Sequence, residues 1–410
     1  MSASEGKLAY DVLISGGGPV GLTLACLLKK ECPHIEVAVF DPLLLTSAKS
    51  DKRTIAMSSA TQWVYQQIGI WEQLARRSGR LDTVLISDQG HAGKTRLTKA
   101  DNKGEPLGYV VDQAELKNAL QSELKSLNVI LESRAIDCCK VTASGVVVTS
   151  EKGNIQADLL VVAEGASSPT RNQLGISHTV HDYDQRAFVA RVDHEKPHAH
   201  LALERFTRRG PGALLPLANP KQSAVVVCLD KEGQSNFNAN DRSAFLAYLD
   251  QLFGFVHGRF TASDEPLSFP LQLTQAEEQV RRGIVLVGNA WRSLHPVAGQ
   301  GYNLAIRTCL ELCSALASNG AYHAYSDARL GDLARLEHFA EKVASDQSLT
   351  TTFSHGLDSL FRQKGVTSAL ARTMGLNLMD SLGPLREPVF AQVMGRGRAL
   401  PELRLLGNQV

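Results

Sequence analysis

The sequence predicts an α/β fold that begins with a Rossmann-like succession of strand, glycine-rich turn and helix. A short aliphatic run near the N-terminus ends in closely spaced glycines and is followed by a helical pattern. A second aliphatic run ends in an acid, and a third, near residue 285, leads into another glycine-flanked helix. Strands that alternate with helices in this order are typical of α/β domains.

The first strand and helix carry a glycine fingerprint. Residues 10–15 have the β-branched, aliphatic content of a buried strand, and residues 22–30 are apolar almost all round, as in a helix under a sheet. Between them, Gly16 permits a tight turn, Gly18 lets the backbone approach a pyrophosphate, and Gly21 lets the helix pack closely on the strand. The pyrophosphate would then lie at the helix N-terminus, where free N–H groups and the dipole favour anions.

The second strand, residues 37–40, ends in Asp41, which follows Gly21 by 20 residues. An acid at this distance is expected to bind ribose hydroxyls. Because strand, helix, second strand and acid all agree with the glycine spacing, we predict dinucleotide binding rather than a glycine-rich surface turn. This motif alone does not separate FAD from NAD.

The second glycine-flanked helix distinguishes between FAD and NAD. Residues 283–288 read as a buried strand, and apolar residues recur with helical spacing from Gly301 onward. The positive end of that helix suits an electron-rich ring that becomes anionic on reduction, as a flavin ring does. The pair of helix starts therefore favours a flavin.

Composition excludes several classes of protein. The 410 residues are 43% hydrophobic and 21% charged, which is enough apolar content for a full core of two or three domains. The net charge of +1 makes nucleic acid an unexpected partner. Seven cysteines without a Cys-x-x-Cys pair indicate neither a disulfide framework nor a metal site, and they favour a reducing compartment. We find no signal peptide and no membrane-spanning run, and expect a cytoplasmic protein.

Longer motifs identify a family resemblance. They are the opening fingerprint, Arg53 in K-R-T-I-A-M-S-S-A-T, the A-E-G at residues 163–165, and G-N-x-x-x-S-L-H-P-V-A-G-Q-G-Y-N-L from residue 288. Together they resemble the single-component FAD aromatic hydroxylases over about residues 8–400, and within them the ubiquinone-biosynthesis branch. Residues 87–93 and 204–211 are most similar to the 2-octaprenyl-6-methoxyphenol hydroxylases.

The resemblance implies a para-hydroxybenzoate-hydroxylase-like architecture. The FAD-binding domain would be discontinuous, formed by residues 1–75, 100–180 and 276–340. A β-sheet substrate domain would comprise residues 76–99 and 181–275, and a helical C-terminal region would comprise residues 341–410. Strand patterns at residues 187–192 and 224–229, separated by Pro- and Gly-rich turns, agree with this layout.

The resemblance also implies the cofactor-binding residues. Arg53 would contact the flavin or its phosphates through its guanidinium fork, and Gln113 would touch the pyrophosphate. Arg53 could instead be a solvated surface residue, and Gln113 an ordinary first-turn residue. The full predicted set is Gly16, Gly18, Gly21, Asp41, Arg53, Gln113, Glu164, Gly165, Asn289, Pro296, Gly299, Gln300, Gly301, Tyr302 and Asn303.

Several positions depart from the family pattern. Glu164 replaces an Asp, and the extra methylene is expected to disturb a direct contact, leaving contact through water. Trp291 and Arg292 stand where smaller residues are expected, and Thr308 stands where an Asp is expected. These departures indicate either a specialised pocket or weakened FAD affinity. Asn289 is usual in the ubiquinone branch and can still bond a ribityl hydroxyl.

No catalytic base is predicted. We interpret His295 as shaping the loop beside the ring system. We expect Cys138, Cys139, Cys309 and Cys313 to be buried small apolar residues rather than redox centres. No metal ligands are predicted.

The resemblance implies a flavin-dependent monooxygenase. FAD would accept a hydride from NADH or NADPH as a transient donor, react with O₂ to give a flavin C4a-hydroperoxide, and hydroxylate a polyprenyl-methoxyphenol in ubiquinone biosynthesis. In such an enzyme the FAD carries out this chemistry, while the protein binds and orients the FAD and the substrate. Two alternatives stay open: a same-fold hydroxylase of a soluble phenol, and a weakly FAD-binding, non-catalytic subunit of a biosynthetic complex.

The C-terminal region suggests a further partner. From residue 353 to 410, seven Lys and Arg face four acids, and apolar residues from Leu357 to Met379 approximate helical spacing. The pattern fits weak, peripheral docking on the inner face of a membrane, or on a ubiquinone-biosynthesis complex, where a lipophilic phenol would be found. A helix packed on the protein's own FAD domain fits the pattern equally well.

Overall fold

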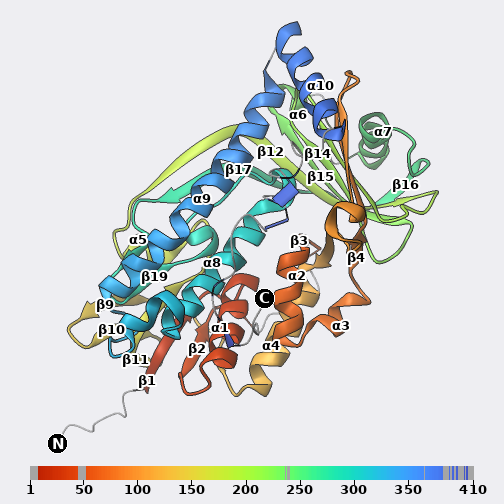
Figure 1. The fold of residues 1–410 in the computed structure, drawn as a ribbon. Helices are drawn as coiled ribbons and strands as arrows, with labels where there is room; N and C mark the ends of the chain where they lie inside the picture. The colour runs from red at the N-terminus through yellow and green to blue at the C-terminus, as the bar shows by residue number, and fades with distance from the viewer. Residues whose placement is uncertain are drawn as a thin grey trace, which may run out of the picture.

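The computed structural model describes residues 8–44, 52–235, 237, 241–363 and 365–381, with 387, 390–391, 394–395, 401 and 403–404. Figure 1 shows an elongated molecule with a sheet-and-helix unit at the N-terminal end and a second sheet at the other end. The long helix α9 (Leu333–Arg362) runs along both units.

The first unit is built on a mainly parallel sheet with the strand order β18-β19-β11-β1-β2-β8. The parallel strands are β1 (Leu8–Ser15), β2 (Val37–Phe40), β8 (Ile130–Glu132), β11 (Gly153–Val162) and β19 (Ile284–Leu286). Antiparallel strands β18 (Val280–Arg281), β9 (Cys138–Thr142) and β10 (Gly145–Ser150) extend it. The three strands predicted from aliphatic runs are confirmed as β1, β2 and β19.

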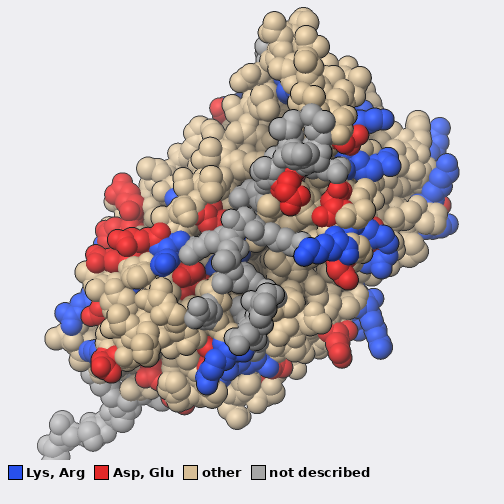
Figure 2. Space-filling view, viewed as in Figure 1, with Lys and Arg blue, Asp and Glu red and all other residues tan. Residues whose placement is uncertain are grey.

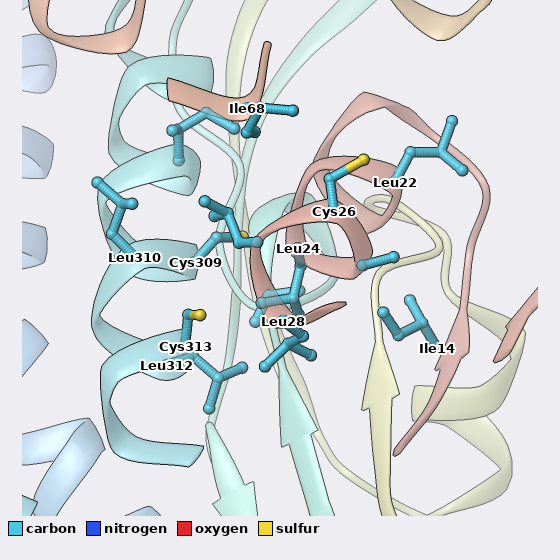
Figure 3. Close-up of a cluster of buried hydrophobic side chains, with 14 of the residues drawn as sticks. Ile14, Leu22, Leu24, Cys26, Leu28, Ile68, Cys309, Leu310, Leu312 and Cys313 are labelled. Atoms are coloured by element: carbon cyan, nitrogen blue, oxygen red, sulfur yellow. The ribbon is translucent and has the colours of Figure 1, made fainter. Parts of the chain in front are cut away.

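Helices pack on this sheet through one apolar core. α1 (Pro19–Glu31), α4 (Gln113–Ser126) and α8 (Gln300–Leu316) contribute to the same buried cluster. Figure 3 shows side chains of α1 and α8 meeting in it, with Cys309 and Cys313 among them. Burial raises the pKa of the Cys309 thiol to about 12, which agrees with an apolar role. Cys138 and Cys139 differ from expectation, since both are only half-buried on β9.

The second sheet has the order β16-β12-β15-β14-β13-β5-β6, and β17 also pairs with β12. Its strands are β5 (Thr83–Asp88), β6 (Lys94–Thr98), β12 (His178–His194), β13 (Leu201–Phe206), β14 (Gly212–Pro216), β15 (Gln222–Asp230), β16 (Phe260–Ser263) and β17 (Leu267–Ala276). The predicted strands at 187–192 and 224–229 lie within β12 and β15. The exact domain boundaries stay a prediction.

A small antiparallel sheet and short helices complete the described chain. Strands β3 (Thr54–Ser58), β4 (Gly79–Leu81) and β7 (Gly108–Asp112) form this sheet beside α2 (Ser59–Ile68) and α3 (Trp71–Ala75). The remaining helices are α5 (Pro169–Gln173), α6 (Lys231–Ser235), α7 (Arg242–Phe253), η2 (Lys99–Asn102), η3 (Gly288–Ala290), η4 (Val297–Gly299) and η5 (Gly320–Tyr325).

The C-terminal helices connect the two units. α9 begins at Leu333, earlier than the predicted start of the helical tail, because the Asp332 side chain caps it by accepting hydrogen bonds from the backbone N–H groups of Ala334 and Arg335. α10 (Val366–Ser381) packs on β5 and β6 of the second sheet. Arg372 of α10 donates to Asp88 of β5 over 3.0 Å, and both side chains are buried.

α10 also covers the edge of that sheet. β6 is its terminal strand, and its backbone N–H groups at Lys94 and Arg96 donate to the side chains of Asn377 and Asp380 on α10. Part of the predicted tail lies outside the described residues. Its described end returns to α1, where the backbone N–H of Arg404 donates to the buried Glu31 carboxylate over 2.9 Å.

Candidate functional site

The site lies where parallel strands end together. Ser15, Phe40, Val162 and Leu286 are neighbours in register across β2, β1, β11 and β19. The loops that follow these residues therefore meet at the carboxyl edge of the sheet, the usual position of ligands in open α/β sheets. The glycine fingerprint, Asp41, the Glu164–Gly165 turn and the start of η3 are brought together there.

The three fingerprint glycines have different surroundings. A Cβ built on Gly16, whose φ is +122°, would lie 2.4 Å from the Ala163 carbonyl oxygen, and one on Gly21 would lie 2.1 Å from the Gly16 oxygen. A Cβ on Gly18 would meet nothing within 4 Å among the described atoms. Packing thus requires the first and third glycines, whereas the second faces open space at the start of α1.

Asp41 follows β2 and holds the glycine turn. Its carboxylate accepts hydrogen bonds from the backbone N–H groups of Gly17 and Leu43, each over 2.7 Å. An ionised carboxylate has about four acceptor positions, so Asp41 keeps capacity for a ligand hydroxyl. Its predicted ribose contact stays a prediction.

Glu164 is engaged by the protein itself. Its carboxylate accepts hydrogen bonds from Ser15 Oγ, from Ser168 Oγ over 2.5 Å, and from the Thr170 backbone N–H over 3.0 Å and Oγ1 over 2.5 Å. The longer side chain therefore folds back onto the loop that follows β11. The neighbouring Gly165 has φ +92° and faces open space, so the backbone of this turn is the part that can approach a ligand closely.

Arg171 was missed by the sequence analysis. Its guanidinium is buried and donates to the carbonyl oxygens of Ala166 over 2.8 Å and Ala290 over 3.1 Å. It thereby ties the loop after β11 to η3. Burial lowers the pKa of Arg171, while Glu164 opposes that shift. A buried Arg in a short helix after Pro169 carries no signal in a single sequence.

The loop before α8 places its predicted residues in different surroundings. Asn289 and Pro296 are exposed, whereas Gln300 is buried. Gly299 adopts φ +59° as the N-cap of α8, and a Cβ there would lie 3.2 Å from the Ala56 Cβ of β3. Gly301 follows in the first turn of α8. The helix start is therefore held close against β3.

Asn303 and Tyr302 bond inside the protein. Asn303 Oδ1 accepts from the Ser58 backbone N–H over 2.9 Å and from Thr61 Oγ1 over 2.7 Å, and its amide nitrogen donates to the Gly299 carbonyl. The Tyr302 hydroxyl pairs with that of Tyr65 in the core. These side chains fix α8 against α2, so any direct cofactor contact by them stays a prediction.

His295 is buried beneath this loop. Its Nε2 lies 2.9 Å from Gln185 Oε1, and its Nδ1 accepts from the Val297 backbone N–H over 3.3 Å. The Tyr183 ring packs edge-on against it at 4.9 Å between centroids. With both ring nitrogens bonded to the protein, His295 is held as a support for the loop rather than as an exposed base.

Arg53 and Gln113 are adjacent at the end of the small sheet. The Gln113 backbone N–H donates to the Arg53 carbonyl oxygen over 3.0 Å, and the Arg53 side chain is exposed. Gln113 is the first residue of α4, as the sequence predicts. Their phosphate contacts stay a prediction.

The unexpected residues Trp291 and Arg292 turn toward α9. Trp291 Nε1 donates to Gln347 Oε1 over 2.9 Å, and Arg292 Nη1 donates to the Gln347 carbonyl over 3.1 Å and to Thr351 Oγ1 over 2.8 Å. Thr308 Oγ1 donates within α8 to the Leu304 carbonyl. The three residues that depart from the family pattern therefore all form hydrogen bonds within the protein.

The residues present fit a flavin dinucleotide. In the described part of the chain, no side chain caps α1 or α8, and neither helix has an acid in its first turn. Their free N–H groups and positive dipole ends are therefore available to an anion and to an electron-rich ring. The open space at Gly18 and Gly165 matches the close backbone approach that such a group needs.

Comparison with known proteins agrees with this geometry. Residues 9–329 match the family model described as FAD binding domain. The ubiquinone hydroxylase UbiL of Rhodospirillum rubrum is 31% identical over 98% of this chain and 93% of its own length. The human mitochondrial ubiquinone biosynthesis monooxygenase COQ6 is 25% identical, over 95% of this chain and 93% of its own.

The fold also occurs in solved structures. The p-nitrophenol 4-monooxygenase PnpA from Pseudomonas putida DLL-E4 aligns with a TM-score of 0.76 at 16% identity, covering 96% of this chain and all of that one. The predicted fold class and the resemblance to the ubiquinone branch of FAD aromatic hydroxylases are confirmed. The chain belongs to the FAD binding domain family and is an FAD-dependent monooxygenase of that family.

Proposed function

We propose that this flavoprotein hydroxylates the ring of a polyprenyl-methoxyphenol in ubiquinone biosynthesis, with O₂ as oxygen source and NADH or NADPH as transient electron donor. The observation that carries the proposal is the similarity to ubiquinone hydroxylase UbiL over 98% of the chain. That similarity extends through the second sheet and the C-terminal helices, where a substrate would be distinguished.

In the proposed reaction FAD supplies the redox chemistry, by way of a flavin C4a-hydroperoxide. The residues of the chain would bind and orient the FAD. The N–H groups at the start of α1, beside Gly18, would hold the diphosphate, and Asp41 would accept from ribose hydroxyls. The N-terminus of α8 would favour negative charge on the ring. His295 and Asn303 would keep the intervening loop in place.

The test of function uses a short-chain 2-prenyl-6-methoxyphenol with the purified, FAD-loaded protein. We expect substrate-stimulated NADH or NADPH oxidation and a product that carries one atom from ¹⁸O₂, measured by mass spectrometry. Equal turnover of a phenol without a prenyl group would favour the soluble-phenol alternative. Weak FAD binding without any product would favour the weakly FAD-binding, non-catalytic subunit.

A peripheral membrane contact is part of the proposal. Val366, Leu370, Met374 and Leu378 recur every four residues on α10 and are exposed, Val366 by 86%. Figure 2 shows few charged side chains on this face of the upper end, where α10 lies. No helix among the described residues is long and apolar enough to cross a membrane. We propose that this stripe, defined by these four residues, rests on a lipid surface.

The structure changes the expected character of that contact. Arg372 is buried with Asp88, and Arg404 lies 3.6 Å from Glu31, so two of the basic residues counted in the tail are paired within the protein. The contact would therefore be mainly hydrophobic and only weakly dependent on salt.

Liposome flotation tests this contact. Leu370→Glu with Met374→Glu is expected to abolish flotation with anionic liposomes, because two charges would enter the apolar stripe. The control Leu349→Glu alters a leucine that is 63% exposed on α9 outside the stripe, and it is expected to leave flotation unchanged. Absence of flotation by the unaltered holoprotein at low salt would rule out direct docking.

A further inference from the structure

Three side-chain hydroxyl groups connect the first turns of α1 and α8. Thr23 lies one turn after Pro19, the first residue of α1, and Tyr302 is the third residue of α8. Between them lies Tyr65 of α2, whose hydroxyl is 2.9 Å from Thr23 Oγ1 and also pairs with the Tyr302 hydroxyl. Thr23 and Tyr65 are fully buried, and Tyr302 is half-buried.

The direction of each hydrogen bond in this hydroxyl chain follows from the group at its end. Thr23 Oγ1 lies 2.6 Å from the Pro19 carbonyl oxygen, which can only accept, so Thr23 donates its single hydroxyl hydrogen there. Thr23 must then accept from Tyr65, and Tyr65 must in turn accept from Tyr302. Burial raises the pKa of both tyrosines, so both keep the hydrogen that they donate.

The hydroxyl chain ends beside the glycine fingerprint, because Pro19 directly follows Gly18. It therefore joins the two helix starts, at α1 and α8, that no described side chain caps. Elsewhere these two helices meet through apolar side chains, as Figure 3 shows. Apolar contacts are non-directional, whereas hydrogen bonds favour a particular distance and angle. The hydroxyl chain is therefore suited to fix the position of one helix start relative to the other.

We propose that Thr23, Tyr65 and Tyr302 are positioning residues for FAD, which match the separation of the two helix starts to the length of the cofactor. The inference rests on the placement proposed above, with the diphosphate at the start of α1 and the flavin ring at the start of α8. A molecule that binds at both places reaches full affinity only where the two sets of N–H groups are correctly spaced, to within about 0.5 Å. The hydroxyl groups act on this spacing through the helices, without touching the cofactor.

The test compares FAD with ADP, which carries a diphosphate but no flavin ring and would therefore bind only at the start of α1. The Kd for FAD is measured by diluting the FAD-loaded, full-length protein and following the fluorescence of the released FAD. The Kd for ADP is measured by displacement of FAD from the same protein. Neither measurement needs a substrate, so a failure of this inference is distinguishable from a failure of the proposed hydroxylation.

Tyr65→Phe interrupts the hydroxyl chain at its centre and keeps the aromatic ring in the core. We expect the Kd for FAD to rise about five- to tenfold, the factor that corresponds to one buried hydrogen bond, and the Kd for ADP to stay unchanged. Thr23→Val, which removes the end of the hydroxyl chain with little change of shape, should give the same pair of results. This second variant keeps the test open if Tyr65→Phe does not fold.

Tyr322→Phe is the matched control. Tyr322 is also buried, and its hydroxyl donates over 2.7 Å to Glu311, which lies on α8 about three turns from the start of the helix. The same atom is thus removed from a tyrosine that bonds the same helix elsewhere, and the Kd for FAD should stay unchanged. A rise equal to that of Tyr65→Phe would overturn the proposal, because loss of stability alone would then explain both.

Three other results would also overturn the proposal. One is an unchanged Kd for FAD in Tyr65→Phe or Thr23→Val. Another is an equal rise of the Kd for FAD and ADP, because the hydroxyl groups would then act on α1 alone. The third is a failure of ADP to displace FAD from the unaltered protein, because the start of α1 would then not bind a diphosphate independently of α8.

Discussion

Three buried histidines, His194 at the end of β12 with His198 and His257, predict that the stability of the fold falls at acidic pH. His257 is 4% exposed, and its ring lies 5.1 Å from that of His194. Burial, followed by the charges that His194 and His198 would carry, lowers the pKa of His257 to about 4. Burial also lowers the pKa of His194 and of His198. All three rings are therefore neutral in the folded protein near pH 7.

The sign and size follow from proton linkage. The unfolded chain binds a proton at His257 below a pKa of about 6.5, whereas the folded protein does so only near pH 4. Between these values the unfolded state holds more protons, so the free energy of unfolding falls as the pH falls. For His257 alone, the loss between pH 7.5 and pH 5.5 is about 1.4 kcal/mol. His194 and His198 act in the same direction.

Urea unfolding at these two pH values measures the effect. His257→Asn is expected to reduce the pH-dependent loss of unfolding free energy by about 1.4 kcal/mol. The same substitution at the exposed His34 should leave that difference unchanged. A His257→Asn protein with the full pH dependence of the unaltered chain would refute the linkage reasoning.

Four further variants have defined outcomes. Gly18→Val should abolish FAD binding in a fluorescence titration, because the side chain would fill the open space at the start of α1; retained affinity would contradict this placement. Asp88→Asn should lower the free energy of unfolding by about 3–5 kcal/mol, since Arg372 would be left buried without its partner. The double variant Asp88→Leu with Arg372→Met should lose less free energy of unfolding than Asp88→Asn, because no charge is then left buried without a partner. A larger loss in the double variant would argue that the unpaired buried charge is not what destabilises Asp88→Asn. Glu164→Gln should weaken the hydrogen bonds that this carboxylate accepts, and so lower the free energy of unfolding by about 1.5–3 kcal/mol and the melting temperature with it. An unchanged melting temperature would show that these hydrogen bonds do not stabilise the fold.

Local patterns predicted the elements that depend on neighbouring residues. The strand at residues 37–40 and the helix that begins at the glycine fingerprint follow from hydrophobic runs and breakers, and both agree with β2 and α1. The hydrogen bonds of Glu164 join residues up to 149 positions apart, and those of Trp291 reach Gln347, 56 positions away. Contacts at such separations depend on how helices and strands pack, which one sequence does not encode as a pattern.

The contacts between α10 and β6 have a consequence for shortened forms of the protein. A terminal strand with unpaired N–H and C=O groups can add a strand from another molecule, and such pairing leads to aggregation. Asn377 and Asp380 occupy two of these N–H groups, and α10 covers the strand. A chain that ends before Val366 would expose this edge. Such a chain is expected to self-associate through β6, even where both sheets are correctly folded.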